Sequence, residues 1–104
     1  MNDILNLLGL IYRARKMVLG EEILNQIRSV KLLILAEDIS EKSSIRYEKK
    51  CHYYQIRCIS IFNSSQLSEA LGKNNVKAIG ITDKGFAETL LNKLKEGYHG
   101  KTDL

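Results

Sequence analysis

The sequence predicts an α/β protein, a three-layer α/β/α sandwich around a small, mostly parallel or mixed sheet of four strands. Segments with apolar residues at helical spacing alternate with short apolar runs of strand length. The joints between them are short and polar, and the chain contains no proline and no repeat. A length of 104 residues suits one compact domain.

The chain begins with a predicted helix and a short strand. Apolar side chains recur every three or four residues over 3–13, where Asn2 or Asp3 can cap the free amide groups. The apolar piece 17–19 ends at Gly20, which predicts a strand followed by a sharp turn.

A second helix and a central strand come next. Glu21 and Glu22 suit the first turn of a helix over 21–29, because the positive end of the backbone dipole stabilises carboxylates. The continuous apolar run 32–36 is flanked by polar residues, which predicts a strand covered on both faces.

The middle of the chain predicts a long helix and another strand. Ser40 can cap a helix that runs to about Tyr53, and a strand follows at 58–62. This helix is basic, with Lys42, Arg46, Lys49 and Lys50.

A helix with clear end signals and a strand come after it. Asn63 followed by Gln66 resembles a capping box that opens a helix through Leu71. Gly72 is placed to end that helix. A strand is expected at 76–81.

The last helix is predicted at 86–97, and 98–104 are expected to form a flexible tail, so that 1–97 are the single domain. No apolar run approaches the roughly 18 residues needed to cross a bilayer. The first residues carry an acid before their apolar part and basic groups after it, the reverse of a secretory signal. We therefore expect a cytoplasmic protein with no membrane partner, and a monomer by default.

The composition favours a polyanionic partner without identifying it. The formal net charge is +4. Neither a metal nor a cofactor is needed to stabilise a domain of this size. Cys51 and Cys58 are too few for a disulfide scaffold, and we interpret them as reduced.

No pattern of catalytic residues stands out. The sequence has no Walker-type loop, no GxGxxG after a strand and no GxSxG. Cys51 and His52 are neighbours, so on a helix they point to different faces and make a poor metal pair, and His99 lies in the tail. Glu21 and Glu22 are interpreted as dipole complements. We expect no enzymatic activity, no cofactor and no metal.

Basic residues gather at the ends of the predicted elements. Arg13, Arg15 and Lys16 lie between the first helix and the first strand, near Gly20 and the second helix. Arginine side chains and the amides of a helix N-terminus both favour phosphate, so together they would form a phosphate-binding corner. On charge alone, a solvated basic face is an equal alternative.

Two further groups are weaker candidates. Lys42 and Arg46 share one face of their helix and either extend that corner or are simply exposed. The loop 72–75 combines glycine, lysine and asparagine. Asparagine amides can bind base edges, although any turn uses the same residue types.

Three segments carry a family resemblance through their order and spacing. They are NLLGLIYRARKMVLGEE, LLILAEDISEKS and LSEALGKNNVKAIGITDKGFAETL. The most specific pieces are the helix-to-GEE junction, the AED tripeptide that closes the buried strand and the DKGFA segment that opens the last helix. In this order, from about Asp3 to Glu96, they resemble the bacterial YlxQ-type branch of the ribosomal-protein L7Ae superfamily.

The resemblance implies an α/β/α sandwich that binds structured RNA, typically the kink-turn, a sharply bent helix with tandem sheared G·A pairs. It implies that the RNA is held by the glycine turn after the first strand, the start of the second helix and the loop before the last strand. Where strong kink-turn binders carry Asn, Glu and Lys, this chain has Glu22, Ile23 and Gln26. The residues that match the RNA-holding places are Gly20, Glu21, Glu22, Gln26, Gly72, Lys73, Asn74, Asn75 and Val76.

We therefore expect a noncatalytic protein that binds kink-turn-like or ribosomal RNA and is associated with translation or the ribosome. The alternatives are a protein-interaction module on the same fold and a small enzyme acting on RNA or nucleotides. Phosphate contacts are expected from Arg13, Arg15, Lys16 and Lys73, close backbone approach at Gly20, and base contacts from Glu22, Asn74 and Asn75.

Overall fold

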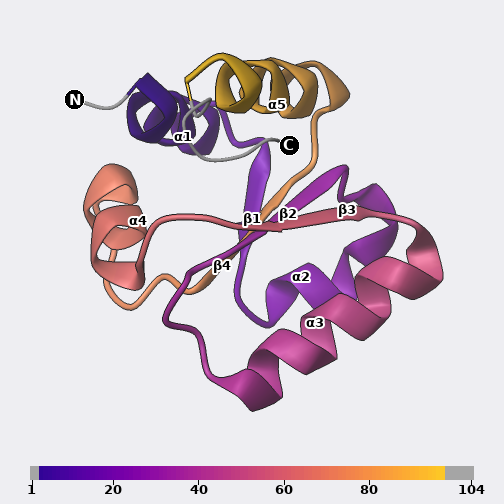
Figure 1. Ribbon diagram of the computed structural model, residues 1–104. Coiled ribbons are helices and arrows are strands. Elements are labelled where there is room, and N and C mark those ends of the chain that lie inside the picture. The colour runs from indigo at the N-terminus through magenta and orange to yellow at the C-terminus, as the bar shows by residue number, and fades with distance from the viewer. Residues whose placement is uncertain (1–2, 98–104) are drawn as a thin grey trace.

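The residues that the structure describes, 3–97, form a three-layer α/β/α sandwich in the computed structural model (Figure 1). The strands are β1 (Met17–Leu19), β2 (Leu32–Leu35), β3 (Arg57–Ser60) and β4 (Ala78–Ile81). They form one sheet in the order β1-β4-β2-β3. Only the β2/β3 pair within this sheet is parallel, so the sheet is mixed and the mostly parallel alternative is wrong.

Helices cover both faces of this sheet. They are α1 (Asp3–Arg13), α2 (Glu22–Asn25), the 3-10 turn η1 (Ile27–Ser29), α3 (Glu41–Tyr54), α4 (Ser64–Leu71) and α5 (Lys84–Gly97). Figure 1 shows α1, α4 and α5 on one side of the sheet, and α2 and α3 on the other. The tail expected at 98–104 and its His99 lie outside the described residues.

The central strand β2 contributes to two separate apolar cores. Its side chains alternate between the faces, so that Leu32 and Ile34 enter one core and Leu33 and Leu35 the other. The first core continues into α1, α4 and α5 through Leu8, Ile11, Leu67 and Leu90. The second continues into α2, η1 and α3 through Ile23, Ile27, Tyr47 and Cys51. The expectation of a strand covered on both faces is confirmed.

The predicted end signals of α3 and α4 act as expected. The Ser40 hydroxyl accepts a hydrogen bond from the Ser43 amide at 3.2 Å. Asn63 and Gln66 form a complete capping box, in which each side chain accepts from the other residue's backbone amide at 2.9 Å. Gly72 ends α4 in the left-handed region, at φ +68°.

The single helix predicted over 21–29 is wrong. Gln26 leaves the helical region at φ −115° and ψ 26°, and the chain then tightens into the 3-10 turn η1. The Ser29 amide and hydroxyl both donate to the Gln26 carbonyl, at 2.9 Å each. Such a tightened turn is common at a helix C-terminus.

Three strands are shorter than predicted. In the run 32–36, the strand ends before Ala36. The segment predicted as 58–62 begins at Arg57 and stops at Ser60, because Phe62 turns into the left-handed region at φ +64°. The segment predicted as 76–81 begins at Ala78, because the Val76 amide donates to the Ser68 hydroxyl at 2.8 Å and is not available to a neighbouring strand.

The cysteines lie together between α3 and β3. Cys51 is buried and Cys58 is half-buried, and both are free thiols. A hydrogen bond with Cys58 and burial both raise the pKa of the Cys51 thiol. A thiol with a raised pKa is protonated and unreactive at neutral pH, so we assign Cys51 to packing in the core.

Gly9 allows α1 and α4 to pack closely. A Cβ added at Gly9 would lie 2.8 Å from the Ala70 carbonyl oxygen, which belongs to the α4 backbone and cannot rotate away. Gly9→Ala is therefore expected to lower the free energy of unfolding by about 1–3 kcal/mol, measured by urea denaturation.

Gly85→Ala in α5 is the matched control. A Cβ there would meet only the Asp83 carboxylate, at 3.3 Å, which needs to move by a few tenths of an ångström and can do so without losing the hydrogen bond that it accepts from the Phe86 amide. Alanine also favours the helix over glycine, so the control should leave stability nearly unchanged or slightly raised. An equal loss of unfolding free energy in Gly9→Ala and Gly85→Ala would contradict close packing at Gly9.

Candidate nucleic-acid interface

Two turns that are distant in sequence meet at one end of the sheet. Gly20 follows β1 and Asn75 precedes β4, and both adopt the left-handed region, at φ +58° and +59°. The Gly20 amide donates to the Ala78 carbonyl at 3.3 Å, because β1 pairs antiparallel with β4. The turns and the start of α3 surround a hollow of about 210 Å³, lined by Gly20, Ile39, Ser40, Ser43, Tyr47, Asn75, Lys77 and Ala78.

The loop before β4 is held in place at both ends. The Lys73 amide donates to the Ser68 carbonyl at 3.0 Å, and the Val76 amide donates to the Ser68 hydroxyl at 2.8 Å. Between these bonds Lys73, Asn74 and Asn75 are exposed. The loop thus presents one cation and two amides on a backbone whose shape is already fixed.

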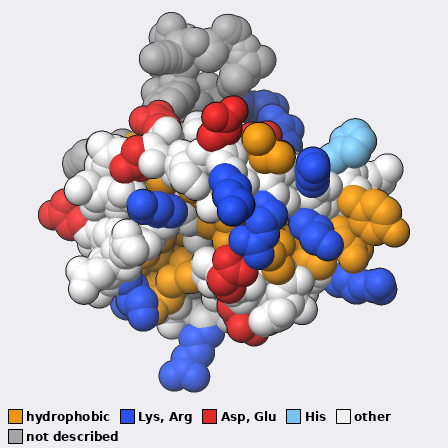
Figure 2. Space-filling model, turned by 90° about the horizontal axis from the view of Figure 1, so that it is seen from below, with side chains coloured by type: hydrophobic (Ala, Val, Ile, Leu, Met, Phe, Trp, Pro, Cys, Tyr) orange, Lys and Arg blue, Asp and Glu red, His pale blue; other side chains and the backbone are white. Residues whose placement is uncertain are grey.

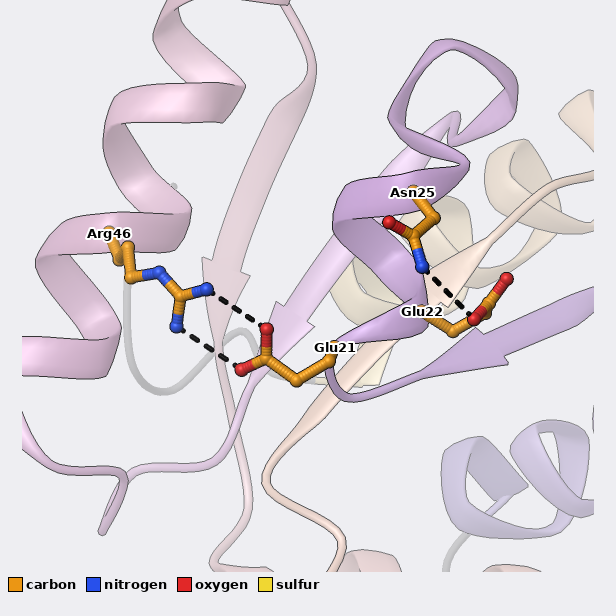
Figure 3. A network of polar contacts seen from close by, with 4 residues as sticks. All are labelled: Glu21, Glu22, Asn25 and Arg46. Carbon is orange, nitrogen blue, oxygen red and sulfur yellow. Dashed lines mark hydrogen bonds and ion pairs between the residues drawn. The ribbon is translucent and has the colours of Figure 1, made fainter.

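The start of α2 is tied to α3 by an ion pair. The Arg46 guanidinium donates two hydrogen bonds to the Glu21 carboxylate, at 2.9 and 3.1 Å, and Figure 3 shows the two groups facing each other. These hydrogen bonds and the charge of Arg46 lower the pKa of Glu21 from its usual value. Arg46 was predicted to extend a phosphate-binding corner, but its charge is compensated by Glu21.

Glu22 is engaged by its own helical turn. Its carboxylate accepts from the side-chain amide of Gln26 at 3.0 Å and from that of Asn25 at 3.3 Å, and Figure 3 shows the contact with Asn25. These two bonds lower the pKa of Glu22. Glu22 and Gln26, both predicted to contact RNA, therefore orient each other on the exposed side of α2.

The basic residues before β1 lie away from this hollow. Lys16 is next to the C-terminal end of β4, where its carbonyl accepts from the Thr82 amide at 3.0 Å. Gly20 lies at the other end of β4, about 13 Å from Lys16 along the extended chain. The expectation that Arg13, Arg15 and Lys16 form one corner with Gly20 is wrong, because β1 separates them from the turn.

Sequence reasoning missed part of the hollow's lining. Ser43 and Tyr47 come from α3, Ser40 is the residue that caps it, and Lys77 directly precedes β4. The basic charge of Lys77 beside the predicted loop 72–75 was the one local signal available. Nothing local in the sequence of α3 indicates that its first turns face Gly20.

A basic surface extends over the α2 and α3 side of the molecule. Figure 2 shows Lys and Arg side chains gathered over this face, with acidic groups among and around them. Lys42 is exposed near the start of α3, and Lys49 and Lys50 are exposed further along it.

The described residues give no sign of a metal centre. In 3–97, His, Cys, Asp and Glu side chains nowhere gather in groups of three or more suited to an ion. None of the helices described there combines the length and the apolar character needed to cross a membrane.

Comparisons with known proteins cover most of the chain. The sequence model of the Ribosomal protein L7Ae/L30e/S12e/Gadd45 family matches residues 3–91. The Bacillus subtilis protein named RNA-binding protein YlxQ is 36% identical over 91 residues, which are 85% of this chain and 91% of that protein. A protein of the same name from Enterococcus faecium is 36% identical over 87 residues, 81% of this chain and 84% of that protein.

Solved structures share the fold. A Bacillus halodurans protein of unknown function superposes with a TM-score of 0.84 at 33% identity, covering 91% of this chain and 99% of that one. The Giardia lamblia 15.5kD RNA binding protein superposes with a TM-score of 0.71 at 17% identity, covering 89% and 82%. The second likeness concerns the fold alone.

The ion pair at the start of α2 can be tested by titration. Arg46→Gln is expected to raise the pKa of Glu21 toward its usual value, measured by NMR of the side-chain carboxyl, because the stabilising hydrogen bonds and charge are lost. Since the folded-state pKa is lowered, the pair favours folding above the unfolded-state pKa, and this contribution is lost as pH falls through the folded-state value.

Glu22 serves as the internal control, because its pKa is lowered by Gln26 and Asn25 and not by Arg46. The pKa of Glu22 should be the same in the unmodified protein and in Arg46→Gln. A Glu21 pKa that does not change in Arg46→Gln would show that the pair does not form in solution.

Proposed function

Because the chain belongs to the Ribosomal protein L7Ae/L30e/S12e/Gadd45 family, as a YlxQ-type member, we propose that it is a noncatalytic protein that binds structured RNA. Both curated relatives are named RNA-binding proteins, and each aligns with more than four-fifths of this chain. One domain acts as a monomer in the cytoplasm, and ribosomal or other translation-associated RNA is the proposed class of partner.

The meeting of Gly20 and Asn75 in one hollow is the observation that carries this proposal. A Cβ added at Gly20 would find no atom within 4 Å, so the backbone there is open to an incoming ligand. Asn75 and Lys77 line the same hollow and carry amide and ammonium donors. A sugar-phosphate backbone needs such close approach and such donors.

The charges around the hollow favour a bent RNA over a regular duplex. Glu22 repels phosphate but can accept hydrogen bonds from the amino groups of guanine or cytosine, and Asn74 and Asn75 can pair with base edges. Phosphates would be held by Lys73 and Lys77. A kink-turn, the sharply bent helix that the family resemblance implies, presents base edges and backbone phosphates together, and we propose it as the ligand.

The cations at the other end of β1 take an outer role in this proposal. Arg13, Arg15 and Lys16 are exposed, and Arg15 holds a left-handed conformation at φ +63°. An RNA helix that continues past the hollow along the sheet would reach them. Lys42 on α3 is proposed as a similar outer phosphate contact, whereas Arg46 would have to exchange its bond to Glu21 for one to phosphate.

The first test is a titration of the protein against a labelled kink-turn RNA and an unkinked duplex of matched length, at low and moderate salt. We expect tighter binding to the kink-turn at both salt concentrations, because only the bent helix presents base edges and phosphates together. Equal, salt-sensitive binding to both would refute kink-turn specificity. No binding to either would favour the protein-interaction module.

The second test locates the phosphate contacts. Lys73→Ala with Lys77→Ala should weaken kink-turn binding and lower the slope of log affinity against log salt by about two. Arg15→Ala with Lys16→Ala removes the same charge at the far end of β1 and is the matched control.

On a short kink-turn the control should bind like the unmodified protein, and it should weaken only when one RNA arm is lengthened. The loop would be excluded as the main phosphate contact if the two double variants lost affinity equally on the short RNA.

A further inference from the structure

An exposed aromatic pair lies at the far end of α3 from the hollow. The Tyr53 side chain is 77% exposed, more than Leu10 or Ile45, the other large hydrophobic side chains exposed in the described residues. Its ring meets that of Tyr54 edge to face, with centroids 4.8 Å apart and planes at 82°. The pair therefore offers one flat, exposed aromatic ring that a ligand could contact.

This pair has a rigid support. Tyr54 is half-buried and packs against the core between the sheet, α2 and α3. The Arg28 guanidinium lies over the Tyr54 ring, 5.9 Å from its centre. A hollow of about 390 Å³ opens beside these groups, lined by Leu24, Asn25, Gln26, Ile27, Arg28, Ser29 and Tyr54.

The charge around the pair is basic. Lys49 and Lys50 precede Tyr53 by one helical turn, and Arg57 follows at the start of β3. All three are exposed, and the one ion pair found in residues 3–97, Arg46 with Glu21, involves none of them. Hydrophobic side chains emerge beside the Lys and Arg groups at one edge of this face in Figure 2.

An exposed aromatic ring among free cations matches a nucleotide better than a protein partner. A base stacks on the ring while its phosphate approaches the cations. A docked protein would need a contiguous apolar patch, but Leu10 belongs to α1, on the opposite side of the sheet, and Ile45 lies eight residues before Tyr53 on α3, about 12 Å away along the helix axis.

We propose that Tyr53, supported by Tyr54 and Arg28, is a stacking platform for an unpaired nucleobase of the bound RNA. Lys49 and Lys50 hold the adjoining phosphates. The platform rests on the proposed RNA-binding function and adds a second contact to it, outside the hollow at Gly20 and Asn75.

The geometry sets how far this base lies from the bend. Ser43 and Tyr47 of α3 line the first hollow, and Tyr53 is one to three turns further along the same helix, about 9–15 Å away. At about 3.4 Å of rise for each nucleotide of a strand, that span corresponds to roughly three or four nucleotides. The proposed ligand is therefore a bent helix flanked by a short single-stranded segment.

The affinity test compares two forms of one kink-turn RNA, one blunt and one with an extension of about four uridines at either end. Tyr53→Ala should weaken binding of an extended RNA by about five- to a hundredfold and leave the blunt RNA unchanged. Tyr53→Phe keeps the ring and should bind like the unmodified protein. Leu10→Ala, an exposed apolar truncation on the opposite side of the sheet, is the matched control and should have no effect.

If Tyr53→Ala lost affinity equally for the blunt and the extended RNA, the proposal that Tyr53 stacks on an unpaired base would be refuted. Unchanged affinity for every RNA would overturn the platform. If self-association changed at the same time, Tyr53 would be a protein contact instead.

A fluorescence test separates the platform from the kink-turn. The sequence contains no tryptophan, so Tyr53→Trp places a single indole at the platform. Titration with a short oligouridylate should quench its fluorescence, and the same titration of Leu10→Trp should not. Quenching by the oligouridylate without binding of a kink-turn RNA would support the platform and refute the bent-helix ligand. Binding of a kink-turn RNA without quenching by that RNA or by the oligouridylate would refute the platform and support the bent-helix ligand.

Discussion

The burial of β2 on both faces is the constraint from which the remaining structure follows. Leu32, Leu33 and Ile34 are fully buried and Leu35 is 2% exposed, so no side chain of this strand contacts water. A strand whose side chains are apolar on both faces needs an apolar layer over each face. Helices α1, α4 and α5 cover one face of the sheet, and α2 and α3 cover the other. Both layers are therefore fixed relative to the sheet before any ligand binds.

Antiparallel pairing of β1 with β4 turns this scaffold into a site. Because Leu19 pairs with Ile79, the turn after β1 must lie beside the residues that precede β4. Gly80 leaves room for the side chains that pack over this pair of strands, since an added Cβ would lie 3.0 Å from a Val18 methyl group and 3.2 Å from a Val30 methyl group. The position of the hollow is thus a consequence of strand register, and loop composition decides only which donors line it.

Local pairing of acidic groups distinguishes the two halves of the α2 and α3 surface. Near the hollow, Glu21 compensates Arg46, and Glu22 is hydrogen-bonded within its own turn. Toward the end of α3, the cations near Tyr53 have no such partners among the described residues. In the proposed complex, the first half would face bases, and the exposed lysines of the second half would face phosphates.

The sequence by itself determined the fold class, both ends of α4 and the family. The capping box of Asn63 and Gln66, the stop at Gly72 and the double burial of 32–36 each depend on residues a few positions apart, whose side chains act on their own backbone.

Only the tertiary structure decided how the site is assembled. Lys16 and Gly20 are close in sequence but are held apart by an extended strand, whereas Gly20 and Asn75 are brought together by strand pairing. The sequence left Arg46 as an extension of the phosphate-binding corner or as simply exposed, because its partner Glu21 lies 25 residues away in the chain. The spacing of residues along the chain determines local structure. Contacts across the sheet depend on strand register and packing, and these join residues so far apart in the sequence that no local pattern links them.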